Sequence, residues 1–322
     1  MRAYYVRITE PKSGDVLAFY TSFNPDGTTN GAALKVEFDI PVYAYGDPVG
    51  GARVKISGVN FSDIVAARNL NDMNIEVYGG MAKGLPLANP AQAGILLKGQ
   101  IFQAYGNWQG REVSLELIAY AQAGTNADPA NISYTWRAGT PLGDAVKQVL
   151  QIAYPGAPIT GSLSSSLVYP QDQPWVYKTL PQLAAYVLKT SRAIIPASTY
   201  PGASLWQQGA GFFLTDGTVK PTAKPISFLD LIGQPTWVDP GTMQFRTVLR
   251  ADLNGGDVVQ MPQKSLINVT SGAAVNALTK DKFVTSFNGE FTIRNIRHLG
   301  DSRQNSAEAW ISVFDTYVGT PT

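Results

Sequence analysis

The chain has 322 residues, with 25 Lys+Arg against 24 Asp+Glu, one histidine and no cysteine. A net charge of +1 argues against an electrostatic nucleic-acid binder, and the lack of cysteine excludes disulfides, a thiol nucleophile and cysteine-based metal sites. Charged residues make up only 15% of the chain, so little self-repulsion keeps copies apart. The composition favours a component of an assembly.

Polar and apolar residues alternate in short segments of the first 125 residues, a pattern typical of half-buried strands. These segments are 35–40, 53–59, 74–78, 95–102 and 112–118. The glycine-rich stretch 105–110 predicts a hairpin loop between the last two. Short strands with glycine-rich turns indicate a barrel or sandwich, and we assign 1–125 to a first β-barrel domain.

Residues 126–225 have a different pattern, which indicates a small inserted α/β domain. Thr140 and Pro141 are suited to begin a helix whose apolar stripe runs to Ala153. A second helix is expected to open at Thr179, with Gln182 completing a capping box. We expect a loop over 155–178 and a hairpin over 212–219, around an Asp-Gly turn.

The last segment, 226–322, returns to the β pattern and is assigned to a second β-barrel domain. Ser227 is placed to cap a short helix over 228–232. Strands are expected at 244–250, 258–260, 290–296 and 309–314. The whole chain is therefore predicted to be mainly β, and α+β overall.

Two segments of the chain echo each other. Residues 98–102 lead through a turn into 113–118, and residues 288–292 lead through a longer loop into 309–314. Each segment begins with the pattern polar, Gly, polar, apolar, and each ends in a second strand that closes the hairpin. Two related barrels that flank an inserted domain would produce this repeat. The alternative is that any two glycine-led hairpins look alike.

Candidate catalytic features are few. Five aspartates could supply a pair of catalytic carboxylates: Asp72, Asp230, Asp239, Asp252 and Asp257. Nothing in the sequence brings two of them together, and all five lie in turn-like contexts, where aspartate is common for structural reasons. His298, Asp301 and Ser302 lie on one stretch of chain, whereas a catalytic triad needs groups that converge in space. We expect His298 to donate to a backbone carbonyl or to Asp301. The sequence predicts no enzyme, no cofactor and no metal site.

Aromatic and basic residues also admit two interpretations. Exposed tryptophans could stack on sugars, but packing in a core or a subunit interface is favoured; the tryptophans are Trp108, Trp136, Trp175, Trp206, Trp237 and Trp310. Arg294, Arg297 and Arg303 are interleaved with acidic residues near the C-terminus. That mixture suits an interface ion-pair network better than a phosphate track.

Four stretches of the C-terminal third carry the most specific motifs, namely 226–237, 245–253 with 256–258, 288–303 and 309–310. In this order they resemble the baseplate hub proteins of tailed bacteriophages, and the resemblance covers about 226–315. It is weaker over 1–125, where 74–80 matches best, and poor over 126–225. The matching positions are expected to be structural or to lie at interfaces: Trp237, Arg250, Asp252, Gly256, Asp257, Gly289, Arg294, Arg297, His298, Gly300, Asp301, Ser302, Arg303 and Trp310.

This resemblance implies two tube-protein-like β-barrels in each chain and a homotrimeric ring with pseudo-sixfold symmetry. One face of the ring would dock the hexameric tail tube, and the other a three-fold central spike or other tail-tip proteins. DNA would pass only in transit, through a central channel that is not strongly basic. The chain would be synthesised in the bacterial cytoplasm, would have no membrane anchor, and would reside in the virion tail baseplate.

Three other functions stay open. A distal-tail or tube-initiator ring protein would form a true hexamer from one barrel. A spike-family component of a contractile injection system uses the same kind of ring. A glycan-binding or cell-wall-degrading tail protein would require a sugar site.

Overall fold

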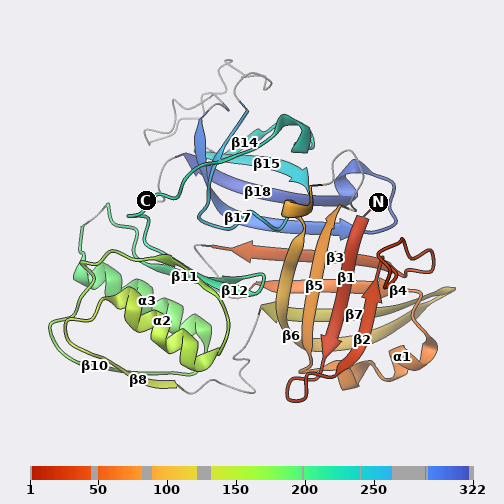
Figure 1. The fold of residues 1–322 in the computed structure, drawn as a ribbon, viewed down its shortest axis with the longest axis horizontal. Coiled ribbons are helices and arrows are strands. Elements are labelled where there is room, and N and C mark those ends of the chain that lie inside the picture. The colour runs from red at the N-terminus through yellow and green to blue at the C-terminus, as the bar shows by residue number, and fades with distance from the viewer. Residues whose placement is uncertain are drawn as a thin grey trace.

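The computed structural model describes residues 2–44, 50–81, 89–121, 132–197, 199–239, 241–262, 287 and 289–318. The fold is mainly β, as the sequence predicts. One large sheet runs through the first and last parts of the chain in the order β14-β15-β18-β17-β3-β4-β7-β6-β5-β1-β2, and two small sheets belong to the middle part. The middle part lies to one side of the large sheet (Figure 1).

The first part is a barrel-like unit of two crossing layers. Figure 1 shows β1, β2 and β5 running across the direction of β3 and β4. Strand β6 belongs to both layers, because its residues before Phe102 pair with β5 and those after it pair with β7. The elements are β1 (Arg2–Thr9), β2 (Val16–Thr21), β3 (Lys35–Tyr43), β4 (Gly51–Ser57), α1 (Phe61–Val65), a 3-10 turn (Ala67–Leu70), β5 (Asn74–Met81), a 3-10 turn (Pro90–Gln92), β6 (Gly94–Gln109) and β7 (Glu112–Ala121).

The hairpin between β6 and β7 is longer than the sequence predicts. Residues 105–109 continue strand β6 instead of forming a loop, and the turn consists only of Gly110 and Arg111. Gly110 has a φ of +62°, a left-handed conformation that glycine adopts at little cost. The glycine-rich composition was therefore a poor guide, because the pairing with β7 extends through Gln109.

The middle part is an α/β unit around two amphipathic helices. Its elements are β8 (Ile132–Trp136), α2 (Leu142–Ala153), β9 (Ile159–Ser162), β10 (Gln173–Tyr177), α3 (Leu180–Ile194), β11 (Ser204–Gln208) and β12 (Gly211–Thr215). The apolar stripes of both helices face one buried cluster, which includes Val146, Val149, Leu183 and Val187. Both helices lie where the sequence predicts and bury the predicted face, but the predicted caps do not form. The N-cap of α2 is Pro141 and not Thr140. Thr179 caps α3 without a side-chain hydrogen bond, and Gln182 accepts the N–H of Lys178 at 3.0 Å instead of completing a capping box.

Two expectations for this middle part are wrong. The stretch 155–178 contains strands β9 and β10, which a composition rich in proline, serine and glycine concealed. The Asp216-Gly217 turn does not close a hairpin; β12 instead pairs with the preceding β11, and in parallel with β9. Asp216 is buried and accepts the backbone N–H of Ser164 at 2.8 Å, so it ties a loop to the sheet.

The last part returns to the large sheet. Its elements are β13 (Lys224–Pro225), a 3-10 turn (Phe228–Asp230), β14 (Thr236–Asp239), β15 (Thr242–Val248), β16 (Val258–Gln260), β17 (Glu290–Asp301), a 3-10 turn (Ala307–Ala309) and β18 (Trp310–Val318). The Ser227 cap is present, because its hydroxyl accepts the N–H of Leu229 at 3.3 Å. The helix that it caps is a single turn, shorter than expected.

Strands β17 and β3 join the first and last parts. They pair antiparallel from Asn295 opposite Tyr43 to Asp301 opposite Glu37. Two sequence segments more than 200 residues apart thus form one ladder, and we call this pairing the internal seam. It places the two barrel-like units edge to edge within one chain.

The two long hairpins share the same irregularity. In the β6–β7 pair, Ile101 and Gln103 face consecutive residues of β7, which leaves Phe102 as a bulge. In the β17–β18 pair, Arg294 is the bulge in the same manner. Each bulged strand continues for seven residues beyond the bulge, to Gln109 and to Asp301 respectively. A shared bulge is a specific feature of strand geometry. The bulges align residue 102 with residue 294, whereas the sequence echo aligns 102 with 292, so the two alignments of the hairpins differ by two residues.

Candidate functional site: the polar face of the shared sheet

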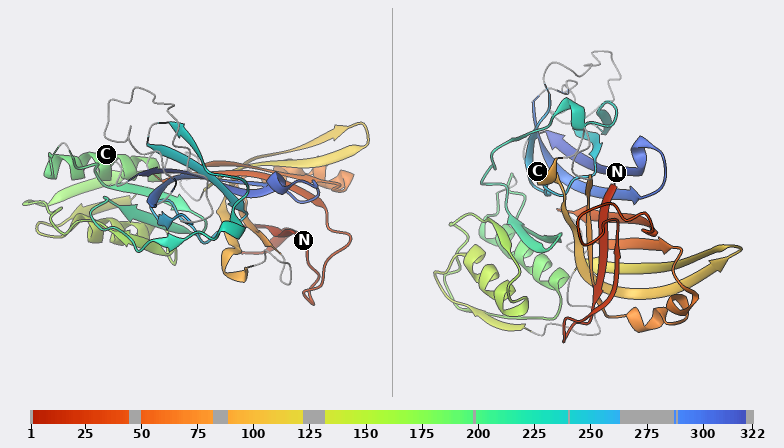
Figure 2. Two further views of the ribbon diagram at one scale, coloured as in Figure 1. Left: turned by 90° about the horizontal axis from the view of Figure 1, so that it is seen from above. Right: turned by 45° about the vertical axis from the view of Figure 1, so that its right-hand side comes forward.

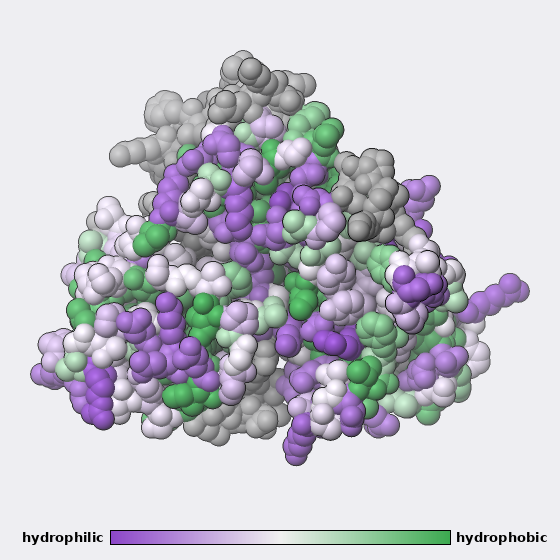
Figure 3. Space-filling view, in the orientation of Figure 1, coloured by the Kyte–Doolittle hydropathy of each residue, from purple (hydrophilic) through white to green (hydrophobic). Residues whose placement is uncertain are grey.

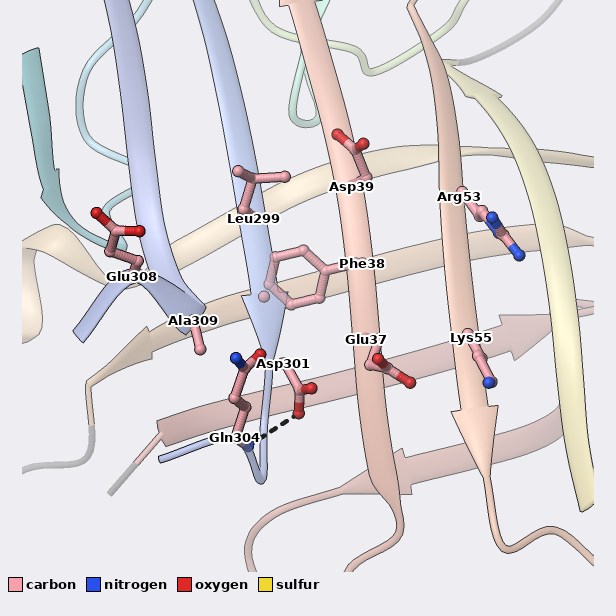
Figure 4. A pocket seen from close by; sticks show the side chains of 11 residues that line it. Glu37, Phe38, Asp39, Arg53, Lys55, Leu299, Asp301, Gln304, Glu308 and Ala309 are labelled. Carbon is pink, nitrogen blue, oxygen red and sulfur yellow. Dashed lines mark hydrogen bonds between the residues drawn. The ribbon is translucent and has the colours of Figure 1, made fainter. Parts of the chain in front are cut away.

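Strands β15, β18, β17, β3, β4 and β7 have one face against the core and one face away from it. On β3, Val36, Phe38 and Ile40 are buried, whereas the alternating Glu37 and Asp39 are not. This period of two follows from strand geometry. We call the side opposite the core the polar face. Figure 4 shows part of it, with Glu37 and Asp39 on one strand beside Arg53 and Lys55 on the next.

Charged side chains on the polar face pair across strands. Across the internal seam, Arg297 binds Asp39 through two hydrogen bonds, of 2.8 Å from Nε and 2.5 Å from an Nη atom. Arg53 holds Glu116, with 3.0 Å from Nε and 2.9 Å from an Nη atom to one carboxylate oxygen. These hydrogen bonds raise the pKa of both guanidinium groups. Both guanidinium groups therefore stay charged at neutral pH.

Four more ion pairs, made by three cations, extend this pattern. Lys35 Nζ lies 3.1 Å from carboxylate oxygens of both Glu37 and Asp301. The other two pairs lie farther out on the sheet, Lys55–Glu112 at 2.9 Å and Arg246–Glu308 at 2.9 Å. Exposed pairs contribute roughly 0–1 kcal/mol each, too little to hold the sheet together. Their main consequence is that the charges in these pairs cancel one another.

A shallow groove of about 440 Å³ lies on the polar face at the end of the internal seam. Its lining includes Glu37, Asp39, Arg53, Lys55 and Asp301, all of which are in the ion pairs described above. Among the described residues, no cluster of three or more potential ligands could hold a metal ion. The groove therefore offers mixed, compensated charge. Figure 3 shows a similar mixture of hydrophilic and hydrophobic residues on the face seen in Figure 1.

His298 lies inside the sheet and not on a loop. It is 1% exposed, and its Nδ1 is 2.8 Å from the hydroxyl of Ser312, directly opposite on β18. The expected partners, a backbone carbonyl or Asp301, are not used. Ser312 also bonds the backbone N–H and C=O of Arg250, each at 3.1 Å. Burial lowers the pKa of His298 to about 4, so the ring is neutral, and its enclosure leaves no access for a substrate.

Arg250 and Asp252 form a second buried group. The Arg250 side chain is 6% exposed and makes two hydrogen bonds to Asp252, of 2.7 and 2.6 Å. Asp230 lies 3.4 Å from the same guanidinium and also accepts a 2.9 Å bond from Gln92 of the first part. Two of the dispersed aspartates are thus brought together, contrary to expectation. The bond from Gln92 connects this group to the first barrel-like unit, and we call the four residues the latch.

Three other motif residues pack in the core or against aromatic rings. Trp310 is buried in the core of the first part, where its Nε1–H donates to the carbonyl of Gly80 at 2.8 Å. Gly300 lies against the ring of Phe38, which an added Cβ would approach to 2.3 Å. Trp237 stacks on Phe287 with ring centroids 5.8 Å apart.

The remaining motif positions lie at loops and strand ends. Ser302 pairs with the backbone of Val36 at the start of β3, with two bonds of 2.9 Å. Arg303 donates to the carbonyl of Ala33. Asp257 binds Lys224 at 2.6 Å. Gly256 and Gly289 both have positive φ, and Arg294 is the exposed bulge residue of β17.

The interleaved charges near the C-terminus find their partners outside the cluster. Arg297 pairs with Asp39 of β3, whereas the interleaved acidic residues find partners elsewhere: Glu290 binds Lys220 and Glu308 binds Arg246. Sequence reasoning missed Asp39 and Glu116 because their partners are far away in the chain. The only signal was the polar–apolar alternation of β3 and β7.

No helix in the part of the chain that the structure describes is long and apolar enough to cross a membrane. No protein-family model matches the sequence, and no curated protein matches it.

The fold does match solved structures of tail proteins over nearly the whole chain. The tail protein from Neisseria meningitidis MC58 is 11% identical, with a TM-score of 0.53 over 98% of this chain and 96% of that chain. The prophage MuSo2 43 kDa tail protein from Shewanella oneidensis is 8% identical, with a TM-score of 0.50 and the same coverage of both chains, 98% and 96%.

Components of secretion systems match as well. The E. coli c3393 protein is described as a component of the type VI secretion system that is structurally similar to T4 bacteriophage tail proteins gp27 and gp5. It is 8% identical, with a TM-score of 0.50 over 91% of this chain and 78% of that chain. A structure of the Francisella PdpA-VgrG complex is 7% identical, with a TM-score of 0.54 over 100% of this chain and 59% of that chain. The chain therefore has the fold of these phage tail proteins, as the resemblance of its C-terminal third predicts, and shares it with a component of the type VI secretion system.

Proposed function

We propose that this protein is a structural component of a phage tail baseplate hub. Three copies would form a ring of six tube-like units, because each chain carries two barrel-like units joined edge to edge by the internal seam. The observation that carries the proposal is the repeated bulged hairpin, with Phe102 and Arg294 in the same position of each unit. The ring would reside in the virion tail.

Symmetry matching is the physical reason for such a duplication. Six similar surfaces in a ring present a repeat that a hexameric tail tube can dock on. The α/β unit occurs once per chain, so a trimer keeps true three-fold symmetry where it meets a three-fold spike. Tail-tube protein, spike and other tail-tip proteins are thus the proposed partners.

The polar face would line the central channel. Strongly basic walls would hold DNA phosphates through counterion release, whereas the cations described above on this face are paired with carboxylates. A compensated wall lets DNA pass in transit without specific binding. The protein would then act by geometry and binding rather than by catalysis, without a cofactor.

The mass of the purified protein in solution tests this proposal. Light scattering coupled to size-exclusion chromatography should give three times the 34.6 kDa chain mass, about 104 kDa. A mass of six chains would favour a distal-tail or tube-initiator ring. A stable monomer that binds neither tube nor spike protein would contradict the proposal.

A second candidate is a spike-family component of a contractile injection or secretion system. It is favoured by the fold match to the type VI secretion component and to the PdpA-VgrG complex. Pull-down against the tube proteins of a phage tail and of a secretion system would separate the two candidates. The phage proposal expects retention of the phage tube protein alone.

A further inference from the structure

Two stretches at the edges of the shared sheet carry no strand partner among the described residues. Strand β6 pairs with β7 through Gln109, but its pairing with β5 ends at Gln100. On that side Asn71 Oδ1 accepts the N–H of Ala104 at 2.8 Å, so the open stretch of β6 is 105–109. At the β14 end of the strand order, β14 pairs only with β15. Open edges are templates for further pairing.

We propose that these two edges pair with each other between neighbouring copies, and that the contact repeats the internal seam. This inference rests on the proposed ring and specifies how the ring closes. Within one chain, the bulged strand β17 already pairs with β3. Strand β6 is the second bulged strand, and β14 occupies the place of β3 in the second unit. The same contact should therefore form between subunits.

The positions of β3 and β14 in their units can be matched through the bulges. In the first unit, Asp39 of β3 lies opposite Arg53 of β4, and Arg53 lies opposite Ile118 of β7. Ile118 in turn lies opposite the residue of β6 that follows the Phe102 bulge. A parallel set occurs in the second unit: Thr236 opposite Gln244, Gln244 opposite Asp315, and Asp315 facing the position after the second bulge. Thr236 therefore corresponds to Asp39.

The register of the new seam follows from this match. In the internal seam, Asp39 lies opposite Leu299, the fifth residue after the Arg294 bulge. The fifth residue after the Phe102 bulge is Asn107. Asn107 should therefore lie opposite Thr236 of the partner subunit. Two residues along, Tyr105 should lie opposite Val238 of the partner subunit.

The side chains near both edges are suited to burial. Val238 on β14 is 48% exposed and lies at the bulge of the β14–β15 pair, between Trp237 and Asp239. Near the end of β6, Trp108 is 66% exposed and meets the ring of Phe61 edge-on, with centroids 5.6 Å apart. Figure 2 shows the β6–β7 hairpin projecting at the end of the molecule away from the α/β unit. Two different edges that meet head to tail make a heterologous contact, the kind that closes a ring.

Because the chain has no cysteine, paired cysteine substitutions test the register directly. Directly opposite residues of antiparallel strands have Cβ atoms roughly 4.5–5.5 Å apart, near enough for a disulfide after small adjustments. The test variant is Asn107→Cys with Thr236→Cys. The second variant, Tyr105→Cys with Val238→Cys, covers the case in which the first fails to fold. The control joins Asn107→Cys to Val176→Cys, a residue that is 78% exposed on β10.

After mild oxidation, non-reducing gels should show that at least one in-register pair converts most of the protein to linked dimers and trimers. The control should stay monomeric on the gel. If both in-register variants remain trimers in solution but do not crosslink, the seam is refuted and the ring proposal stands. If the unmodified protein is not a trimer, the ring proposal fails together with the seam.

Discussion

The buried imidazole of His298 makes the stability of this protein sensitive to mild acid. Its folded-state pKa is about 4, because the ring is enclosed between β3 and β18 and hydrogen-bonded to Ser312. The ordinary value for an exposed histidine is about 6.5. Between these two values the unfolded chain binds the proton and the folded chain does not. The free energy of unfolding must therefore fall as the pH falls through this window.

The size of the effect follows from the difference in pKa. At pH 5 the unfolded histidine is mostly charged and the folded one mostly neutral, so the difference contributes about 1.36 kcal/mol for each pH unit below 6.5. The expected loss from pH 7 to pH 5 is about 2 kcal/mol. For a chain of 322 residues, that loss should lower the melting temperature by about 3 °C.

The measurement is a thermal melt at pH 7 and pH 5 for the unmodified protein and for His298→Gln. Glutamine is neutral and can still hydrogen-bond to Ser312, so other titrating groups cancel in the comparison. The unmodified protein should lose about 3 °C more than the variant. Because the chain has only one histidine, its NMR signal can also be followed directly. Equal losses in both proteins, or titration of that signal near pH 6.5, would refute the reasoning.

Three further predictions concern the latch, the internal seam and the polar face. Arg250→Met should lower the free energy of unfolding by about 1–3 kcal/mol, because it leaves the partly buried carboxylates of Asp230 and Asp252 without their cation. Arg246→Met, on an exposed pair, should lower it by less than about 1 kcal/mol in urea unfolding; equal losses would contradict the latch. Gly300→Ala should lower the free energy of unfolding by about 1–3 kcal/mol, because the added methyl group overpacks against Phe38. Adding Phe38→Leu should restore part of that free energy in the same urea-unfolding assay. Asp39→Lys should convert the polar face to net basic and produce salt-sensitive binding of labelled duplex DNA in fluorescence anisotropy; tight DNA binding by the unmodified protein would contradict the proposed channel wall.

Local patterns predicted the mainly β class and both long helices. The stripe from Leu142 to Ala153 faces one core, as its spacing indicates. The strands β9 and β10 were missed because they are short and lie in a loop-like composition. The extent of β6 was missed because its pairing with β7 outweighs the turn preference of its glycine and asparagine residues.

The candidate site was harder to predict, since its contacts are long-range. The motif residues Arg297 and His298 were identified, but their partners Asp39 and Ser312 were not. An ion pair across the internal seam depends on which strands become neighbours, and no local pattern of residues encodes that choice. The repeated hairpin could be suspected from the sequence, whereas its matched bulges required the strand register.

The most direct test of the central proposal is electron microscopy of the assembled particle. Averages viewed along the ring axis should show six tube-like units around an open channel, with three α/β units at the periphery. Strict six-fold symmetry with six peripheral units, or particles without a ring, would contradict the proposal that two barrel-like units per chain build a trimeric hub.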